Sequence, residues 1–112
     1  MDEQFTELLA ELEADFQGFS WKPLNFLPYY FLKLLLRNVE DFHIKLEPLN
    51  FRETIGGAAL DKNRFLMLLE IKKAKRWQYR DNVTFMKHLT QALEHAKEII
   101  ERLKKLRSSG KI

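Results

Sequence analysis

Apolar side chains recur every three or four residues along most of this chain, which is the spacing of one face of an α-helix. In residues 2–17 the acidic positions fall mostly off the apolar face, as an amphipathic surface helix requires. Asp2 is suited to cap the start of this helix, and Gly18 is suited to end it. The pattern predicts an acidic amphipathic helix within residues 1–18, with the apolar positions Phe5, Leu8, Leu9, Leu12 and Phe16.

The next segment, YYFLKLLLRNVEDF at residues 29–42, is apolar around most of its circumference. Such a segment predicts a central helix that other elements cover on several sides. Pro28 suits the first turn of this helix, because its missing N–H would have no partner there anyway. Beyond it, apolar and polar residues alternate on both sides of Pro48, and this period of two leaves open a short β-hairpin near residues 42–55.

From residue 58 to residue 108 the sequence predicts helix throughout, and no Gly or Pro interrupts it. Two arrangements fit this segment. The chain can turn at Arg80–Asn82, with Asp81 or Asn82 capping a new helix, or one helix of about 50 residues and about 75 Å can run straight through. The capping residues and the small size of the chain favour the turn. A heptad-like apolar seam follows the turn, formed by Met86, Leu89, Leu93, Ala96, Ile100 and Leu103.

These segments predict one domain over residues 1–112. The fold class is mainly α: a small helical bundle of about four helices, with a long C-terminal helix or helical hairpin and a flexible tail at 109–112. A seam of nearly three heptads exceeds what so few elements are expected to cover, so the sequence also predicts a homo-oligomer, most simply a two-fold dimer.

Charge is distributed unevenly along the chain, although the net charge is only +3. Residues 1–20 carry six acids and no base, whereas residues 61–112 carry fourteen Lys and Arg against six Asp and Glu. This asymmetry indicates either an acidic partner for the second half or attraction between the halves, within one chain or across an oligomer.

The densest basic stretch is IKKAKRWQYRDN, residues 71–82, and it contains no acid before Asp81. Basic side chains beside an exposed Tyr can hold phosphates and stack a base, which favours nucleic acid. Short basic runs are also common on helical proteins, so a protein-facing or solvated surface is the other interpretation. The candidate residues for nucleic acid or an acidic partner are Lys72, Lys73, Lys75, Arg76, Tyr79 and Arg80.

Catalytic and metal-binding patterns are scarce. The chain has no Cys, which excludes disulfides, thiolate zinc sites and a cysteine nucleophile. Glu40 and His43 match the Glu-x-x-His motif of di-iron bundles, but that site needs a second copy, which the sequence lacks. His88 and His95 are two helical turns apart, about 10.5 Å, too far to share a zinc ion. We therefore expect no enzymatic activity, no cofactor and no metal.

The longest apolar run, residues 26–36, is interrupted by Lys33 and is much shorter than the roughly 20 residues that span a bilayer. The acidic start is unlike a secretory leader, so we expect a cytoplasmic protein without a membrane partner. The function that the sequence favours is a non-enzymatic helical protein-interaction module or small subunit, which self-associates through the seam. The alternative is a nucleic-acid-binding protein that uses the basic Lys72–Arg80 face.

Overall fold

A computed structural model describes residues 7, 9–14, 24, 27–47 and 57–108. The described residues form three long helices, α2 (Tyr29–Leu46), α3 (Gly57–Trp77) and α4 (Asn82–Ser108). Residues 7 and 9–14 are also helical, as expected for the acidic N-terminal helix. The fold is all-helical, which confirms the predicted bundle. Residues 42–46 belong to α2, so a β-hairpin that begins there is wrong. Residues 48–55 of that hairpin, Asp2, Gly18 and the tail at 109–112 lie outside the described residues.

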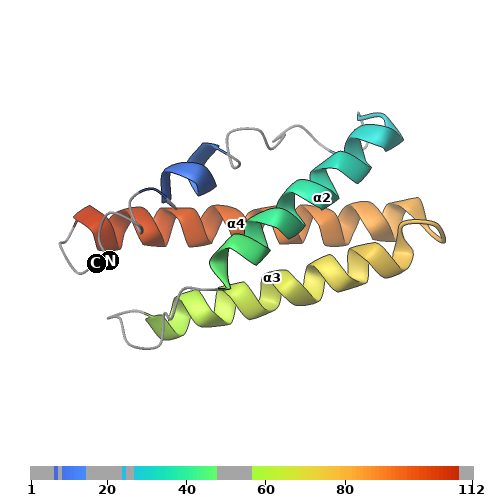
Figure 1. The fold of residues 1–112 in the computed structure, drawn as a ribbon. Helices are drawn as coiled ribbons and strands as arrows, with labels where there is room; N and C mark the ends of the chain where they lie inside the picture. Colours follow the sequence, from blue (N-terminus) through green and yellow to red (C-terminus); the bar gives the residue numbers. More distant parts are fainter. Residues whose placement is uncertain (1–6, 8, 15–23, 25–26, 48–56, 109–112) are drawn as a thin grey trace.

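The C-terminal half is a helical hairpin. In Figure 1, α3 and α4 run side by side, and α2 crosses them diagonally on one side. The N-terminal helical segment lies on that same side, over the C-terminal end of α4. There Glu13 Oε1 is 3.8 Å from Arg107 Nη2. Pro28 immediately precedes α2 rather than lying in its first turn, and its carbonyl accepts hydrogen bonds from the N–H groups of Phe31 and Leu32.

Asp81 ends the connection between α3 and α4, so the predicted turn is correct and the continuous helix is not formed. Its carboxylate accepts hydrogen bonds from the Val83 N–H at 3.1 Å and the Thr84 hydroxyl at 2.6 Å. Its backbone carbonyl accepts the first α4 hydrogen bond, from the Phe85 N–H. This is the geometry of a helix N-cap, which supplies partners to N–H groups that have none inside the helix. The hydrogen bond from Thr84 lowers the pKa of Asp81.

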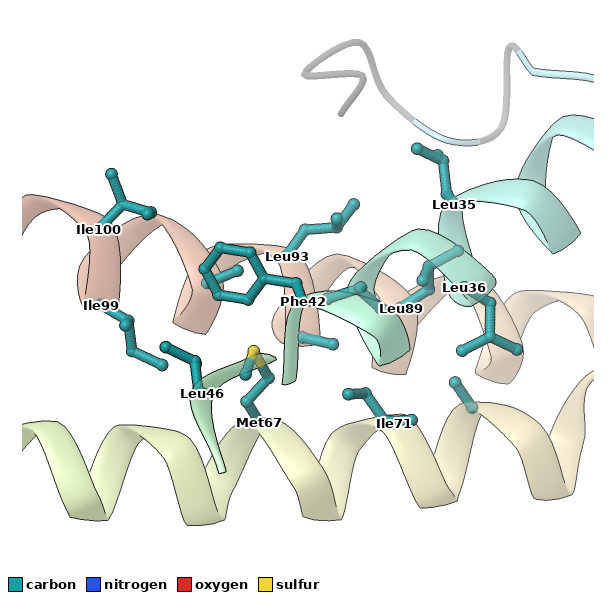
Figure 2. Close-up of a cluster of buried hydrophobic side chains, with 14 of the residues drawn as sticks. Leu35, Leu36, Phe42, Leu46, Met67, Ile71, Leu89, Leu93, Ile99 and Ile100 are labelled. Carbon is teal, nitrogen blue, oxygen red and sulfur yellow. The ribbon is translucent and has the colours of Figure 1, made fainter. Parts of the chain in front are cut away.

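The seam is buried within the chain. Leu89, Leu93, Ala96, Ile100 and Leu103 are all in the core cluster, and Met86 packs against it half-buried. Figure 2 shows side chains of all three helices meeting there: Phe42 and Leu46 from α2, Met67 and Ile71 from α3, and Leu89, Leu93, Ile99 and Ile100 from α4. The reason for expecting an oligomer, a seam without cover, therefore does not hold, because α2 and α3 of the same chain cover it.

The helix α2 buries one side only. Its buried residues are Leu32, Leu35, Leu36, Val39, Phe42, His43 and Leu46, which share one face. On the opposite side, Tyr30, Leu34 and Ile44 are 72%, 47% and 54% exposed. The expectation of a central helix covered on several sides is therefore wrong for the described structure. None of the described helices is long and apolar enough to cross a membrane.

Candidate interaction surface

The basic stretch occupies the last turns of α3 and the turn after it. All six candidate side chains, from Lys72 to Arg80, are exposed. The first turn of α2 lies beside these side chains. A 3.1 Å hydrogen bond, which the Tyr29 hydroxyl donates to the Gln78 carbonyl, holds it there. The ring of Tyr29 also meets the ring of Phe85 of α4 edge-on, at 6.3 Å between centroids. The surface is therefore formed jointly by α2, α3 and the turn.

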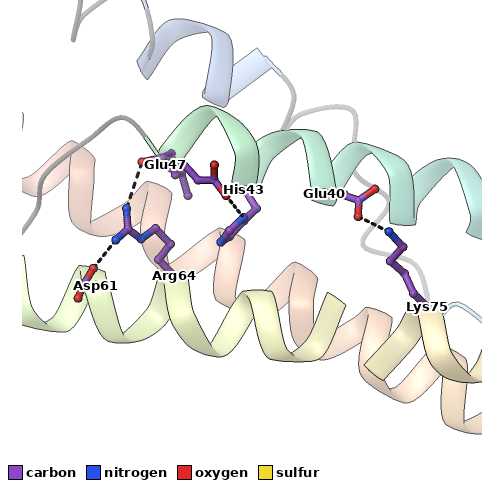
Figure 3. A network of polar contacts seen from close by, with 7 residues as sticks. Glu40, His43, Glu47, Asp61, Arg64 and Lys75 are labelled. Atoms are coloured by element: carbon purple, nitrogen blue, oxygen red, sulfur yellow. Dashed lines mark hydrogen bonds and ion pairs between the residues drawn. The ribbon is translucent and has the colours of Figure 1, made fainter. Parts of the chain in front are cut away.

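Two of the candidate lysines have acidic partners. Lys75 Nζ lies 2.7 Å from Glu40 Oε2 of α2 (Figure 3). Lys73 Nζ lies 3.9 Å from Glu70 Oε1, and the other oxygen of Glu70 lies 2.6 Å from Nδ1 of His88 on α4. Lys75 thus belongs to the side of α3 that adjoins α2, and Lys73 to the side that adjoins α4. The structure does not bring the two lysines together.

The other three cations of the stretch, Lys72, Arg76 and Arg80, have no ion pair among the described residues. Lys33 of α2 joins them, because its Nζ lies 5.3 Å from the ring centre of Tyr79 and 5.5 Å from that of Tyr29. A cation at such distances is attracted to the electron-rich face of each ring. Lys33 lies far from the basic stretch of residues 71–82 in the sequence and is not among the candidate residues predicted there. The sequence does carry a signal for a basic site here, because Lys33 and Arg37 are one helical turn apart in an otherwise apolar segment.

A polar cluster holds the end of α2 against α3 (Figure 3). Arg64 of α3 pairs with Asp61 at 2.6 Å and donates a longer hydrogen bond, 3.4 Å, to the Leu46 carbonyl. The buried His43 lies 3.8 Å from Glu47. Burial lowers the pKa of His43, so its ring is neutral at pH 7. In the described part of the chain no three His, Asp or Glu side chains converge as metal ligands would.

The outer face of α2 is the second notable surface. We define it by five exposed residues that lie opposite the buried side: Tyr30, Leu34, Arg37, Asp41 and Ile44. Three of them are large apolar or aromatic side chains, and the two charged residues are one turn apart and of opposite sign. The sequence carries a signal for this difference, because the charged residues Arg37 and Asp41 lie on the outer face and the buried face contains no Lys, Arg, Asp or Glu.

Comparison of the chain with models of known protein families, with curated proteins and with solved structures found no significant match. Two surfaces are therefore the candidates for function: the basic one at the junction of α2 and α3, and the outer face of α2. Both consist of exposed side chains on helices, whose chemistry suits contact with a macromolecule rather than the enclosure of a small ligand.

Proposed function

We propose that this chain is a helical protein-binding module, and that it docks an apolar protein surface with an acidic rim through the outer face of α2. The observation that carries the proposal is the exposure of Tyr30, Leu34 and Ile44 on one side of a single helix. Single exposed apolar residues are ordinary on a protein surface. Three large ones on one helix face, in a chain with a complete core elsewhere, are typical of an interaction site.

The surroundings of this face support a protein partner. Tyr and Arg, which the face contains, are the residue types that most often dominate the energetics of protein interfaces. The cations Lys33 and Arg37 lie beside the apolar residues and favour a partner with acidic groups at its edge. Self-association through the seam was the route that the sequence favoured. Because the seam is buried by the chain's own helices, we propose the outer face of α2 in its place.

The test is site-specific photo-crosslinking. A photoreactive amino acid is introduced at Leu34 or at Ile44, both on the outer face of α2. The control position is Val83, which lies at the start of α4 and is more exposed, at 72% against 47% and 54%. We expect adducts of one defined mass from positions 34 and 44 and none of that mass from position 83. The purified adduct partner should lose its affinity for the chain on Leu34→Glu and keep it on Val83→Glu. Equal labelling from all three positions would overturn the proposal.

Nucleic-acid binding is the second candidate, and one observation favours it. Lys72, Arg76 and Arg80 are exposed without an ion pair among the described residues, and Tyr79 is 73% exposed beside them. Cations neutralise phosphates, and an exposed ring stacks on an unpaired base. Lys73 and Lys75 contribute less to this surface, since each is engaged by a carboxylate of the chain.

A salt-dependent titration with single-stranded and duplex DNA and RNA tests this second candidate. The logarithm of the affinity should fall linearly with the logarithm of salt concentration, by close to one unit of slope for each phosphate contact on duplex DNA. Arg76→Glu with Arg80→Glu should abolish binding, whereas Arg102→Glu, a reversal on the exposed side of α4, should leave most of it. Tyr79→Ala should weaken single-strand binding more than duplex binding. A wild-type chain that binds none of these probes at low salt excludes the candidate.

A further inference from the structure

The first half of α2 lies along the end of α3 and the turn that follows it. Besides the hydrogen bond made by the first residue of α2, two contacts join these segments. Lys33 Nζ lies 5.3 Å from the ring centre of Tyr79 in the turn. Two helical turns further along α2, Glu40 Oε2 lies 2.7 Å from Lys75 Nζ of α3. Cations of both helices therefore belong to one surface, the α2–α3 junction.

Positive charge at this junction is in excess of negative charge. Two acids adjoin it and each already has partners: Glu40 pairs with Lys75, and Asp81 accepts the N-cap hydrogen bonds of α4. Asp41, one turn beyond Arg37 on α2, marks the end of the basic region. Among the described residues, five exposed cations of the junction have no ion pair: Lys33, Arg37, Lys72, Arg76 and Arg80. Such a group attracts a ligand with several negative charges.

Tyr79 lies within this basic region and is 73% exposed. Lys33 approaches its ring from α2, at a distance where a cation is attracted to the face of an aromatic ring. A ring has two faces, so a flat ligand group can stack on the face that Lys33 does not occupy. The same ligand can then place negative charges beside Lys33 and beside Arg76, which precedes Tyr79 by one helical turn.

The combination of cations with an exposed ring favours single-stranded over duplex nucleic acid. Cations alone do not distinguish the two, because both carry phosphates. A tyrosine ring stacks on a base only where the base is not already stacked within a duplex. A single strand is also flexible enough to follow cations that are supplied by two different helices. Only a single strand therefore uses both features of the junction at once.

We propose that the α2–α3 junction is a binding site for single-stranded nucleic acid, either DNA or RNA. The inference rests on the second of the functions proposed above, and it specifies the ligand and adds α2 to the site. One base stacks on Tyr79, and the phosphates beside it contact Lys33 of α2 and Arg76 of α3. Arg37 and Lys72 extend the path of the strand along the two helices.

Fluorescence anisotropy with the full chain tests the preference for single strands. The probes are a DNA strand and an RNA strand of about twenty nucleotides, longer than common single-strand sites of about 4–16 nucleotides, and the duplex of each with its complement. At the same salt concentration, the single strands should bind about fivefold or more tightly than the duplexes, which is the effect of one stacked base. Tight binding of either single strand supports the proposal, and comparison of the two shows which sugar is preferred.

Lys33 provides the test of the site that spans two helices. Lys33→Gln removes one phosphate contact and should lower the slope of log affinity against log salt by about 0.7 on a single strand. Lys33→Arg keeps the cation and should keep the slope. The control is Lys104→Gln, the same loss of charge at an exposed position near the other end of α4. If Lys33→Gln weakens binding without a change of slope, Lys33 only supports the fold and the assignment to α2 is wrong.

Stacking on Tyr79 is tested with a strand that has phosphates but no bases. Tyr79→Leu should weaken binding of the ordinary single strand by about fivefold or more, whereas Tyr79→Phe, which keeps the ring, should not. An abasic strand of the same length should bind the wild type and Tyr79→Leu equally. Circular dichroism should be unchanged, because the side chain is exposed. An abasic strand that binds the wild type as tightly as the ordinary strand would rule out the stacked base.

The outcomes separate this inference from the proposed functions. Duplexes that bind as tightly as single strands overturn the inference and leave nucleic-acid binding standing. An oligoglutamate peptide of the same net charge, added as a competitor, overturns it if it displaces the strand at equal concentration, and then favours the protein partner with an acidic rim. A chain that binds no nucleic acid at low salt overturns both the inference and the second function.

Discussion

Glu40 of α2 and Lys75 of α3 meet at 2.7 Å between Oε2 and Nζ, although 35 positions separate them in the chain. In the sequence, the basic stretch around Lys75 contains no acid before Asp81. The fold supplies one from another helix, and this single contact changes what the stretch can bind. Together with the Glu70–Lys73 pair, it leaves Lys72, Arg76 and Arg80 as the cations of the stretch with no ion pair among the described residues.

The Glu40–Lys75 pair should contribute little to stability. Both side chains are substantially exposed, so water screens their attraction and holding them still costs entropy. A double-mutant cycle with Glu40→Gln and Lys75→Gln, measured by urea unfolding, should give a coupling free energy below about 1 kcal/mol. The coupling should shrink in high salt. The Glu98–Arg102 pair on α4, also exposed, is the matched control. A coupling several times larger for the first pair would show that it is shielded from solvent.

Asp81 should be needed as a cap rather than as a charge. Asp81→Ala removes the acceptor of the Val83 N–H and the Thr84 hydroxyl, and should lower the melting temperature. Asp81→Asn keeps a side-chain oxygen at the same position and should retain most of the stability. Thermal unfolding followed by circular dichroism measures both. If the two variants lose equal stability, the cap is not the reason for the loss.

The seam should behave as the core of a single chain. Leu89→Ala removes a fully buried side chain and should lower the free energy of unfolding by about 2–5 kcal/mol. Leu34→Ala, on the outer face of α2, should change it by no more than about 0.5 kcal/mol at concentrations where the chain is monomeric. Urea unfolding at low protein concentration provides both values. A small loss for Leu89→Ala would mean that the seam is not packed within the chain.

His43 should make the protein less stable in weak acid. Its pKa is lowered in the folded state, mainly by burial, whereas in the unfolded chain it is near 6.5. As the pH falls below 6.5, the unfolded state therefore takes up a proton that the folded state does not, and the free energy of unfolding decreases. This decrease continues until the pH reaches the folded-state pKa. The charged groups around the ring act in both directions: Arg64 and Lys72 lower its pKa, and Glu47 and Glu40 raise it.

The measurement is the unfolding free energy between pH 7 and pH 5 for the wild type and for His43→Gln. The variant should lose much of the dependence on pH in this range. His88→Gln is the control, because it leaves His43 and its surroundings intact. The carboxylates Asp81 and Glu98, whose pKa values hydrogen bonds lower, act only at more acidic pH. A variant with the full wild-type slope would contradict the assignment to His43.

The sequence alone determined the helices and favoured the division of the C-terminal half. Apolar residues that recur every three or four positions lie on one side of the chain only when the chain is helical. Asp81 and Thr84 form a capping pattern at the start of α4. Its contribution to stability comes from hydrogen bonds between residues that are close in the sequence, so the pattern can be read locally. These signals are local, so the apolar stripe of α4 followed from the residues themselves, and they favoured a turn between α3 and α4 over one continuous helix.

The tertiary structure decided which apolar surfaces are covered. The seam from Met86 to Leu103 looked like an interface for another chain, and α2 looked like a buried central helix. In the structure α2 covers part of the seam and leaves its own outer face, with Tyr30 and Leu34, in solvent. Periodicity records that a side chain is apolar, but burial depends on which helix packs against it. The same holds for charge: the partner of Lys75 is on another helix, and only the packing of α2 on α3 brings Glu40 within reach of it.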